Sequence, residues 1–177
     1  MTLLFATGNP GKASEAKEIL GDVERVDCDY VEVQSNSLAE IAERGARECH
    51  ERLGRPVFVD DSGLFVDAYD GFPGPYSSYV YDTLGNEGLL DLMDDVDGRS
   101  AEFRCVVAYC DGDVRSFEGV SRGRISREPR GEGGFGYDPV FEHESGETYA
   151  EMDASRKNEV SHRRKALESF ADWYTEG

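Results

Sequence analysis

The stretch Leu3-Leu4-Phe5-Ala6-Thr7-Gly8-Asn9-Pro10-Gly11-Lys12 decides how the fold begins. Its apolar first half predicts a buried strand, and the small polar residues and glycines after it predict a tight loop. A helix with apolar residues at helical spacing is expected from Ala13 to Leu20. A helix N-terminus presents unpaired backbone N–H groups and the positive end of the helix dipole. This junction therefore suits an anion, above all a phosphate group.

The side chains of this loop add to the same chemistry. Thr7 and Asn9 supply polar side chains, and Lys12 supplies a full positive charge. The loop is not a Walker A sequence, because only two residues separate its glycines and no Ser or Thr follows the lysine. On these residues alone, an ordinary strand–turn–helix is an equally good interpretation.

Composition limits the class of protein. The chain has 177 residues, of which 38% are hydrophobic and 11% aromatic, so we expect a single domain over residues 1–177 with a real core. The net charge is −18, and only four of the 19 basic side chains are lysines. This pattern is typical of halophilic adaptation, because salt screens the self-repulsion of an acidic surface. It argues against nucleic acid or an anionic membrane as the main partner.

The spacing of the cysteines and the residues near the N-terminus indicate the cellular compartment of the protein. Cys28, Cys49, Cys105 and Cys110 show no CxxC spacing and lie in apolar or helical stretches. We expect four buried free thiols in a reducing cytoplasm, rather than disulfides or a zinc site. The apolar run near the N-terminus is too short for a signal peptide, and no segment reaches transmembrane length. The sequence therefore predicts a soluble cytoplasmic protein.

Helices and strands interleave in the first half of the chain, and strands dominate afterwards. The expected elements are a strand over Val26–Gln34, a helix over Leu38–Leu53, a short strand over Val57–Val59 that Leu64–Ala68 continues, helices over Tyr76–Leu84 and Glu87–Met93, strands over Phe103–Cys110 and Val114–Val120, a short strand at Val140–Phe141 and a helix over Ser161–Tyr174. Asp111-Gly112 is a strong hairpin signal. The fold class is α/β with a mixed sheet.

Two adjacent carboxylates, Asp60 and Asp61, follow the apolar strand at Val57–Val59. Neighbouring strand residues point to opposite faces, so only one of the two should face a given site. A carboxylate in this place can hold a hard cation such as Mg²⁺ or orient a water molecule. We favour Asp61 for this role, with Asp60 as a second candidate, whereas a polar turn cap is the alternative interpretation.

Glu32 is a lone carboxylate between Val31 and Val33. On an alternating strand such a residue usually faces solvent, and this is the better interpretation of Glu32 taken alone. Together with Asp61, it becomes a candidate second metal ligand.

The run Gly133-Gly134-Phe135-Gly136-Tyr137-Asp138-Pro139 combines a flexible turn with two aromatic side chains and a carboxylate. An aromatic side chain held on a glycine-rich loop can stack on a planar base. A core aromatic beside a turn is the alternative and is the more frequent case for a single Phe-Gly pair.

Residues Ser155 to Leu167 form the only dense basic cluster of this acidic chain. Ser161 is expected to cap a helix, with His162 and Arg163 in its first turn. Positive charge there opposes the helix dipole at a cost of roughly 0.3–1 kcal/mol per exposed charge, so an anion or electron-rich acceptor is expected in front of it. Three of the four lysines lie in this cluster or in the first loop.

Five motifs, taken together, resemble the inosine triphosphate pyrophosphatase family, which removes non-canonical purine nucleoside triphosphates. The motifs are Thr7-Gly8-Asn9-Pro10-Gly11-Lys12, Asp60-Asp61-Ser62-Gly63-Leu64, Gly71-Phe72-Pro73-Gly74-Pro75-Tyr76-Ser77, Gly134-Phe135-Gly136-Tyr137-Asp138-Pro139 and Ser161-His162-Arg163. They follow the family's order, at about its spacing, over nearly the whole chain. The resemblance implies an elongated α/β domain with two lobes around a central twisted mixed sheet, a nucleotide cleft between the lobes and a homodimer. It also implies Mg²⁺-dependent hydrolysis of ITP, dITP and XTP to the monophosphate and pyrophosphate.

The resemblance implies roles for individual residues as well. These are triphosphate binding for the loop residues Thr7, Gly8, Asn9 and Lys12, substrate binding for Ser62, and catalysis for Lys12 and Asp61. Asp61 is matched to metal binding or water activation, and Glu32 to metal binding. Base and sugar recognition is implied for Phe135, Gly136, Tyr137 and Asp138, and contacts to the purine and a nearby phosphate for Lys157, His162 and Arg163. One position departs from the pattern. Many members carry a phosphate-binding lysine in the second helix where this chain has Gly45, with Arg44 or Arg47 as candidate substitutes.

Selectivity is expected at the 6-position of the purine. Donors from His162 or Arg163 would pair with the 6-oxygen of hypoxanthine or xanthine and be left unpaired against adenine. Two other functions stay open: a pyrophosphatase of related fold acting on pyrimidine or modified nucleotides, and a nucleotide-binding sensor without turnover. The Ser161-His162-Arg163 motif argues against the first, and Asp61 together with Lys12 argues against the second.

Overall fold

The computed structural model of the chain describes residues 2–176. Its strands are β1 (Leu3–Ala6), β2 (Val23–Val26), β3 (Val57–Val66), β4 (Pro73–Gly74), β5 (Ser100–Cys110), β6 (Val114–Ile125) and β7 (Phe141–His143). Its helices are α1 (Pro10–Leu20), α2 (Leu38–Leu53), α3 (Ser77–Leu92), α4 (Ala154–Val160), α5 (His162–Glu176) and the short 3₁₀ helix η1 (Asp67–Tyr69). The α/β class predicted from the sequence is confirmed.

The strands form one seven-stranded sheet in the order β2-β1-β3-β5-β6-β7, with β4 paired to β3. β1 pairs in parallel with both β2 and β3, whereas β3–β4 and β6–β7 are antiparallel. The predicted mixed sheet is therefore confirmed. The expected hairpin is also present, with Asp111–Asp113 joining β5 to β6.

The chain divides into two compact units. The first contains the residues up to Asp61, Cys105–Gly119 and the residues from His162 onward, and the second contains Ser62–Arg104 and Val120–Ser161. Strands β3, β5 and β6 each contribute residues to both units. Each unit has its own buried apolar cluster.

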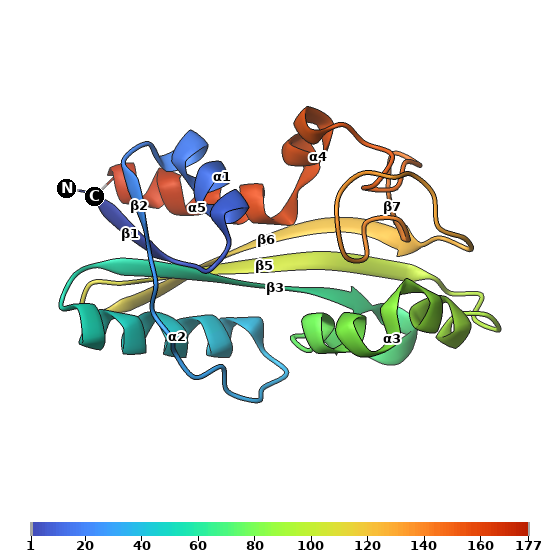
Figure 1. Ribbon diagram of the computed structural model, residues 1–177, viewed down its shortest axis with the longest axis horizontal. Coiled ribbons are helices and arrows are strands. Elements are labelled where there is room, and N and C mark those ends of the chain that lie inside the picture. The colour runs from blue at the N-terminus through green and yellow to red at the C-terminus, as the bar shows by residue number, and fades with distance from the viewer. Residues whose placement is uncertain (1, 177) are drawn as a thin grey trace. The chain divides into compact units, whose positions relative to one another are not determined.

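In the first unit, helices cover both faces of the strands. Figure 1 shows α1 beside α5 on one face and α2 on the other. Apolar residues of β1, β3, β5, α1 and α5 form the core under α1 and α5. Its aromatic centre is a stack of Phe5 on Phe58, with ring centroids 4.3 Å apart, against which Phe170 of α5 packs. Burial of these rings fixes α5 beside α1.

Helix α2 has the bounds that the sequence predicts. Ser37 caps its N-terminus by accepting a hydrogen bond from the Glu40 N–H at 3.2 Å. Gly54 ends it in the left-handed conformation, with φ of 63°. Its buried residues are Leu38, Ile41, Ala42, Gly45, Ala46 and Cys49, which recur at helical spacing.

In the second unit, the motif Gly71 to Ser77 forms a compact turn against β3. Its central Pro73–Gly74 is β4, which pairs with β3 through Leu64 and Phe65. The hydroxyl of Ser77 donates to the Gly74 carbonyl at 2.6 Å and accepts from the Leu64 N–H at 2.8 Å. This motif therefore fastens the start of α3 to β3.

Helix α3 contains a break at Gly85, whose φ of 63° and ψ of −171° are not helical. The sequence predicts two helices here, Tyr76–Leu84 and Glu87–Met93, and the break lies between them. Just before this break Leu84 is exposed, whereas Leu89 after it is buried in the core of the second unit.

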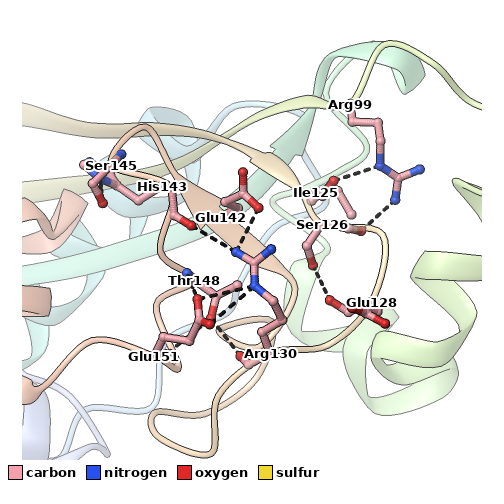
Figure 2. A network of polar contacts seen from close by, with 11 residues as sticks. Arg99, Ile125, Ser126, Glu128, Arg130, Glu142, His143, Ser145, Thr148 and Glu151 are labelled. Atoms are coloured by element: carbon pink, nitrogen blue, oxygen red, sulfur yellow. Dashed lines mark hydrogen bonds and ion pairs between the residues drawn. The ribbon is translucent and has the colours of Figure 1, made fainter.

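The loops between β6 and α4 are held by two arginines (Figure 2). Arg99 is 4% exposed and donates to the backbone carbonyls of Ile125 at 2.8 Å and Ser126 at 2.7 Å. Arg130 forms ion pairs with Glu142 at 2.9 Å and Glu151 at 3.4 Å. The Thr148 hydroxyl donates to the Arg130 carbonyl at 2.7 Å. The Arg130 N–H also donates to the Pro139 carbonyl at 2.9 Å, which joins the two ends of the glycine-rich stretch that contains Phe135.

Two predicted elements differ in extent. The strand expected over Val26–Gln34 is wrong, because β2 ends at Val26 and the next residues up to α2 have no regular structure. The expected helix Ala13–Leu20 begins earlier, at Pro10, where a proline suits the first helical turn. Helix α4 is an element that the sequence analysis missed, and its N-cap is Asp153.

The cysteine prediction is wrong for one pair. Cys28 and Cys49 form a disulfide that joins the segment after β2 to α2. The two residues lie 21 positions apart in the sequence, and only the packing of the segment on α2 brings them together. Cys105 and Cys110 are buried thiols, as predicted.

No helix within residues 2–176 is both long enough and apolar enough to cross a membrane.

Candidate functional site

The first loop is built around the side chain of Asn9. Its Oδ1 accepts hydrogen bonds from the backbone N–H groups of Gly11 at 2.8 Å and Lys12 at 3.3 Å, which caps α1. The Thr7 hydroxyl accepts from the Asn9 N–H at 3.2 Å. Gly8, Asn9 and Gly11 are exposed, and the first turn of α1 contains no acidic residue. The predicted anion-binding junction is therefore open to solvent and free of carboxylates in that turn.

Lys12 is held by a buried carboxylate within the neighbouring strand β3. Its ammonium lies 3.0 Å from both Asp60 oxygens. The Asp60 side chain is 2% exposed, and Lys12 is 23% exposed. β1 and β3 are parallel neighbours with Phe5 opposite Phe58, so the loop after β1 lies beside Asp60, two residues further along β3. Of the two adjacent aspartates, Asp60 is the one that pairs with this lysine.

Arg163, in the first turn of α5, completes an ion-pair network in the first unit. Its guanidinium lies 3.1 Å from Asp60 and 3.4 Å from Glu15 of α1. An anion was expected in front of this helix N-terminus, and these two carboxylates supply it from within the chain. The sequence analysis assigned Arg163 to the purine, and the structure places its guanidinium against Asp60 and Glu15.

The electrostatics of Asp60 follow from this network. Burial alone would raise the pKa of the Asp60 carboxyl, but the charges and hydrogen bonds of Lys12 and Arg163 outweigh burial and hold that pKa below its usual range. The carboxylate therefore stays ionised. Two cations, Lys12 and Arg163, face two carboxylates, Asp60 and Glu15, so the network is formally neutral.

The charges of Asp61 and Glu32 both act on the hydroxyl group of Tyr30, which belongs to the same unit. Burial raises the pKa of Tyr30, and the negative charges of Glu32, Asp60 and Asp61 raise it further. The three carboxylates therefore lie within electrostatic reach of one phenol. Glu32 is exposed, and Asp61 is half-buried.

These carboxylates fit a cation that also binds the substrate. Within residues 2–176, no three His, Cys, Asp or Glu side chains are arranged to hold a metal ion by themselves. Asp60 is paired with Lys12 and Arg163, and Asp61 and Glu32 are the candidate oxygen donors. Mg²⁺ usually takes one or two carboxylates together with substrate phosphates and water. The donor set therefore suits Mg²⁺ bound together with a nucleotide.

A second set of predicted residues gathers in the second unit around Lys157. Its ammonium lies 2.5 Å from Asp138 and 4.7 Å from the centre of the Phe135 ring. Asp138 is buried and also accepts the Phe135 N–H at 2.9 Å. Gly134 has φ of 69°, and a β-carbon there would lie 2.0 Å from the Asp138 carboxylate, so only glycine fits. Phe135 itself is 68% exposed.

Tyr137 and Gly136 follow Phe135 in the sequence, but they contact residues of α3. The Tyr137 hydroxyl donates to the Ser77 carbonyl at 2.7 Å, and its ring packs edge-on against Tyr81. Burial raises the pKa of Tyr137 to about 12. The Gly136 carbonyl accepts from the Asn86 side chain at 2.9 Å. Of the two aromatic residues of the glycine-rich motif, Phe135 is the exposed one.

The remaining predicted residues are placed as follows. His162 is the first residue of α5 and is buried, and Ser62 lies half-buried in β3. Arg44 and Arg47 on α2 are both exposed, and Arg47 lies 3.8 Å from Glu43. The space beside Gly45 is filled by the ring of Tyr30.

Sequence analysis missed Glu15 and Tyr30. Glu15 follows Lys12 by three residues, so both lie on one side of α1, and this spacing was an available signal. Tyr30 had a less direct signal. A glycine at a buried position inside a helical pattern indicates close approach of another group, and Gly45 is such a residue.

The mixed sheet, the capped first loop and the ion pairs behind it define an α/β protein with a site suited to phosphates. A model of the Ham1 family matches residues 3–173, and the chain belongs to this family.

Curated relatives and solved structures agree. The chain is 58% identical to the dITP/XTP pyrophosphatase of Methanopyrus kandleri, over 98% of this chain and 96% of that protein. It is 48% identical to the dITP/XTP pyrophosphatase of Thermococcus kodakarensis, over 99% of this chain and 98% of that protein. The structure of a HAM1 protein from Coxiella burnetii matches with a TM-score of 0.92 and 34% identity, covering 100% of both chains.

Proposed function

We propose that this chain hydrolyses non-canonical purine nucleoside triphosphates, namely XTP, dITP and ITP, to the nucleoside monophosphate and pyrophosphate. The observation that carries the proposal is the exposed, carboxylate-free N-terminus of α1, with Lys12 held against Asp60 and Asp61 next to it. Membership of the Ham1 family and the names of the two archaeal relatives support the substrate class.

Residues of the first unit bind and activate the phosphates in this proposal. The loop residues Thr7, Gly8 and Asn9 face phosphate oxygens at the positive end of the α1 dipole, which favours an anion. Lys12 neutralises charge that develops as the bond between the α- and β-phosphates breaks. Asp61 orients the attacking water and accepts its proton.

Magnesium belongs to the same proposal. Asp61 and Glu32 would hold Mg²⁺, with the remaining positions taken by phosphate and water. The ion would supply charge neutralisation on the phosphates, which the formally neutral Lys12 network alone provides only in part.

Recognition of the base and sugar is the proposed role of the remaining candidate residues. Phe135, exposed on its glycine-rich loop and backed by Lys157, stacks on the purine. Asp138, Gly136 and Ser62 complete the contacts to the nucleoside and phosphates. His162 and the remaining N–H groups of Arg163 donate to the 6-oxygen, which adenine lacks.

The proposal also includes the architecture, the oligomeric state and the cellular location of the enzyme. These are a nucleotide cleft between two lobes of a single domain, a homodimer, and a cytoplasmic location in a cell adapted to high salt. The family membership supports the first two, and the net charge of −18 supports the last.

The test is pyrophosphate release from XTP, dITP, ITP, GTP, ATP and dUTP with Mg²⁺, in 0.1 M and in molar KCl. We expect fast release from XTP, dITP and ITP and slow release from ATP, GTP and dUTP. Asp61→Asn should lower release by about 10²–10⁴-fold. Asp67→Asn changes an exposed aspartate after β3 and should leave release unchanged. Preferred turnover of dUTP would indicate the pyrimidine-type enzyme. Tight binding of XTP without pyrophosphate release would indicate a sensor.

A further inference from the structure

The segment between β2 and α2 has no regular secondary structure, yet it is fastened to α2 along its length. Figure 1 shows it crossing α2 before the chain enters that helix. Residues 28–35 form this segment, which we call the α2 strap. Because it lacks a strand's backbone hydrogen bonds, its side-chain contacts determine where Glu32 lies.

Four contacts besides the one made by Tyr30 hold the α2 strap. They are the Cys28–Cys49 disulfide, the hydrogen bond from the Arg52 guanidinium to the Asp29 carbonyl, the hydrogen bond from the Val31 N–H to Glu48 at 3.2 Å, and the hydrogen bond from the Ser35 hydroxyl to Glu40 at 2.7 Å. The helix residues at 45, 48, 49 and 52 recur at helical spacing and so share one side of α2.

The fifth contact is the ring of Tyr30 on Gly45. A β-carbon built on Gly45 would lie 2.6 Å from Cε2 of that ring and 2.9 Å from its Cζ. Real β-carbons do not approach a ring so closely, so the ring occupies space that any other residue at 45 would fill. Gly45 is a poorer helix former than alanine, and its use here admits the tyrosine.

The contact of the Tyr30 ring with Gly45 lies two residues before Glu32 in the α2 strap. It therefore fixes the part of the strap that carries this carboxylate. The negative charges of Glu32, Asp60 and Asp61 act on the Tyr30 hydroxyl and raise its pKa, in addition to the larger effect of burial.

We propose that Tyr30 is a positioning residue of the active site: its ring on Gly45 fixes the α2 strap and thereby the place of Glu32. This inference rests on the proposed function, because it takes Glu32 as a ligand of the Mg²⁺ that binds with the nucleotide. Tyr30 acts through Glu32 rather than by touching the substrate.

The first experiment tests the Tyr30–Gly45 contact by binding. The probe is an ITP analogue with an imido group between the α- and β-phosphates, titrated calorimetrically with Mg²⁺ present. Gly45→Ala and Tyr30→Ala should each weaken binding at least tenfold, and the double variant should bind no more weakly than Tyr30→Ala alone. Gly98→Ala is the matched control, since a β-carbon there meets nothing within 4 Å, and it should bind like the unmodified protein.

The second experiment separates the ring from the hydroxyl. Tyr30→Ala should raise the half-saturating Mg²⁺ concentration for turnover at least threefold, with kcat at saturating Mg²⁺ within twofold. Tyr30→Phe keeps the ring on Gly45, so its melting temperature, its binding of the analogue and its Mg²⁺ dependence should match those of the unmodified protein. A role in packing alone would leave the Mg²⁺ dependence of Tyr30→Ala unchanged.

Three results would overturn the inference. These are binding by Gly45→Ala within twofold of the unmodified protein, losses that multiply in the double variant, and a Tyr30→Ala enzyme with unaltered Mg²⁺ dependence. Failure of the proposed function is recognised separately, because the unmodified protein would then neither bind the analogue nor release pyrophosphate.

Discussion

The Lys12 ammonium lies 3.0 Å from both carboxylate oxygens of Asp60, whose side chain is 2% exposed. The cation of the first loop is therefore held in place before any ligand arrives. Arg163 shares the same carboxylate at 3.1 Å, and the network keeps Asp60 ionised in spite of its burial. Asp60 and Asp61, adjacent in β3, consequently differ in environment, and their variants should differ in effect.

Removing the charge of Asp60 should lower the free energy of unfolding of the protein. Asp60→Asn leaves Lys12 and Arg163 without their shared partner, and breaking a buried ion pair costs about 3–5 kcal/mol. Asp61→Asn should change the free energy of unfolding by no more than about 1 kcal/mol while lowering turnover by about 10²–10⁴-fold. Urea unfolding and pyrophosphate release measure the two effects. An Asp60→Asn protein as stable as the original would contradict the buried pair.

The Asp60 carboxyl should make the free energy of unfolding depend on pH. The pKa of Asp60 is lower in the folded protein than in the unfolded chain, where it is about 3.9. Its contribution is therefore fully present above about pH 4 and is lost as the pH falls through the lower, folded value. Urea unfolding between pH 2.5 and 6 should show the loss, and Asp60→Asn should show a shallower dependence. Parallel curves for the two proteins would refute this assignment.

Phe135 should matter for the nucleotide and not for folding. Its ring is 68% exposed, so Phe135→Ala should change the free energy of unfolding by less than about 0.5 kcal/mol. Loss of a stacked base costs about 1–3 kcal/mol, which raises KM for XTP roughly 5–150-fold. Steady-state kinetics measure this change. Tyr79→Ala, which removes a ring that is 72% exposed, is the control and should leave KM unaltered.

The disulfide should stabilise the protein through its unfolded state. Cys28 and Cys49 are 21 residues apart, and closing a loop of this size contributes about 3 kcal/mol. Cys28→Ser should therefore lower the free energy of unfolding by about that amount. Dithiothreitol should destabilise the unmodified protein and have no effect on the variant. A thiol assay under denaturing conditions that detects all four thiols without prior reduction would contradict the pairing.

Local patterns predicted much of the fold. Helix α2 has the bounds given by its apolar spacing, its Ser37 cap and its terminal Gly54. The hairpin at Asp111–Asp113 and the break in α3 at Gly85 also follow from turn residues. The strand expected over Val26–Gln34 failed because alternation alone does not supply a partner strand, and α2, not another strand, takes up this segment.

The sequence by itself determined the mixed α/β class, the candidate residues and the capped loop at α1, because these depend on interactions within about one turn or strand of the chain. Tertiary structure decided which groups meet. Lys12 and Asp60 are 48 residues apart, Asp60 and Arg163 are 103 apart, and Tyr30 reaches Gly45 only because its segment packs on α2. Such pairs depend on strand order and helix packing, which local spacing does not encode.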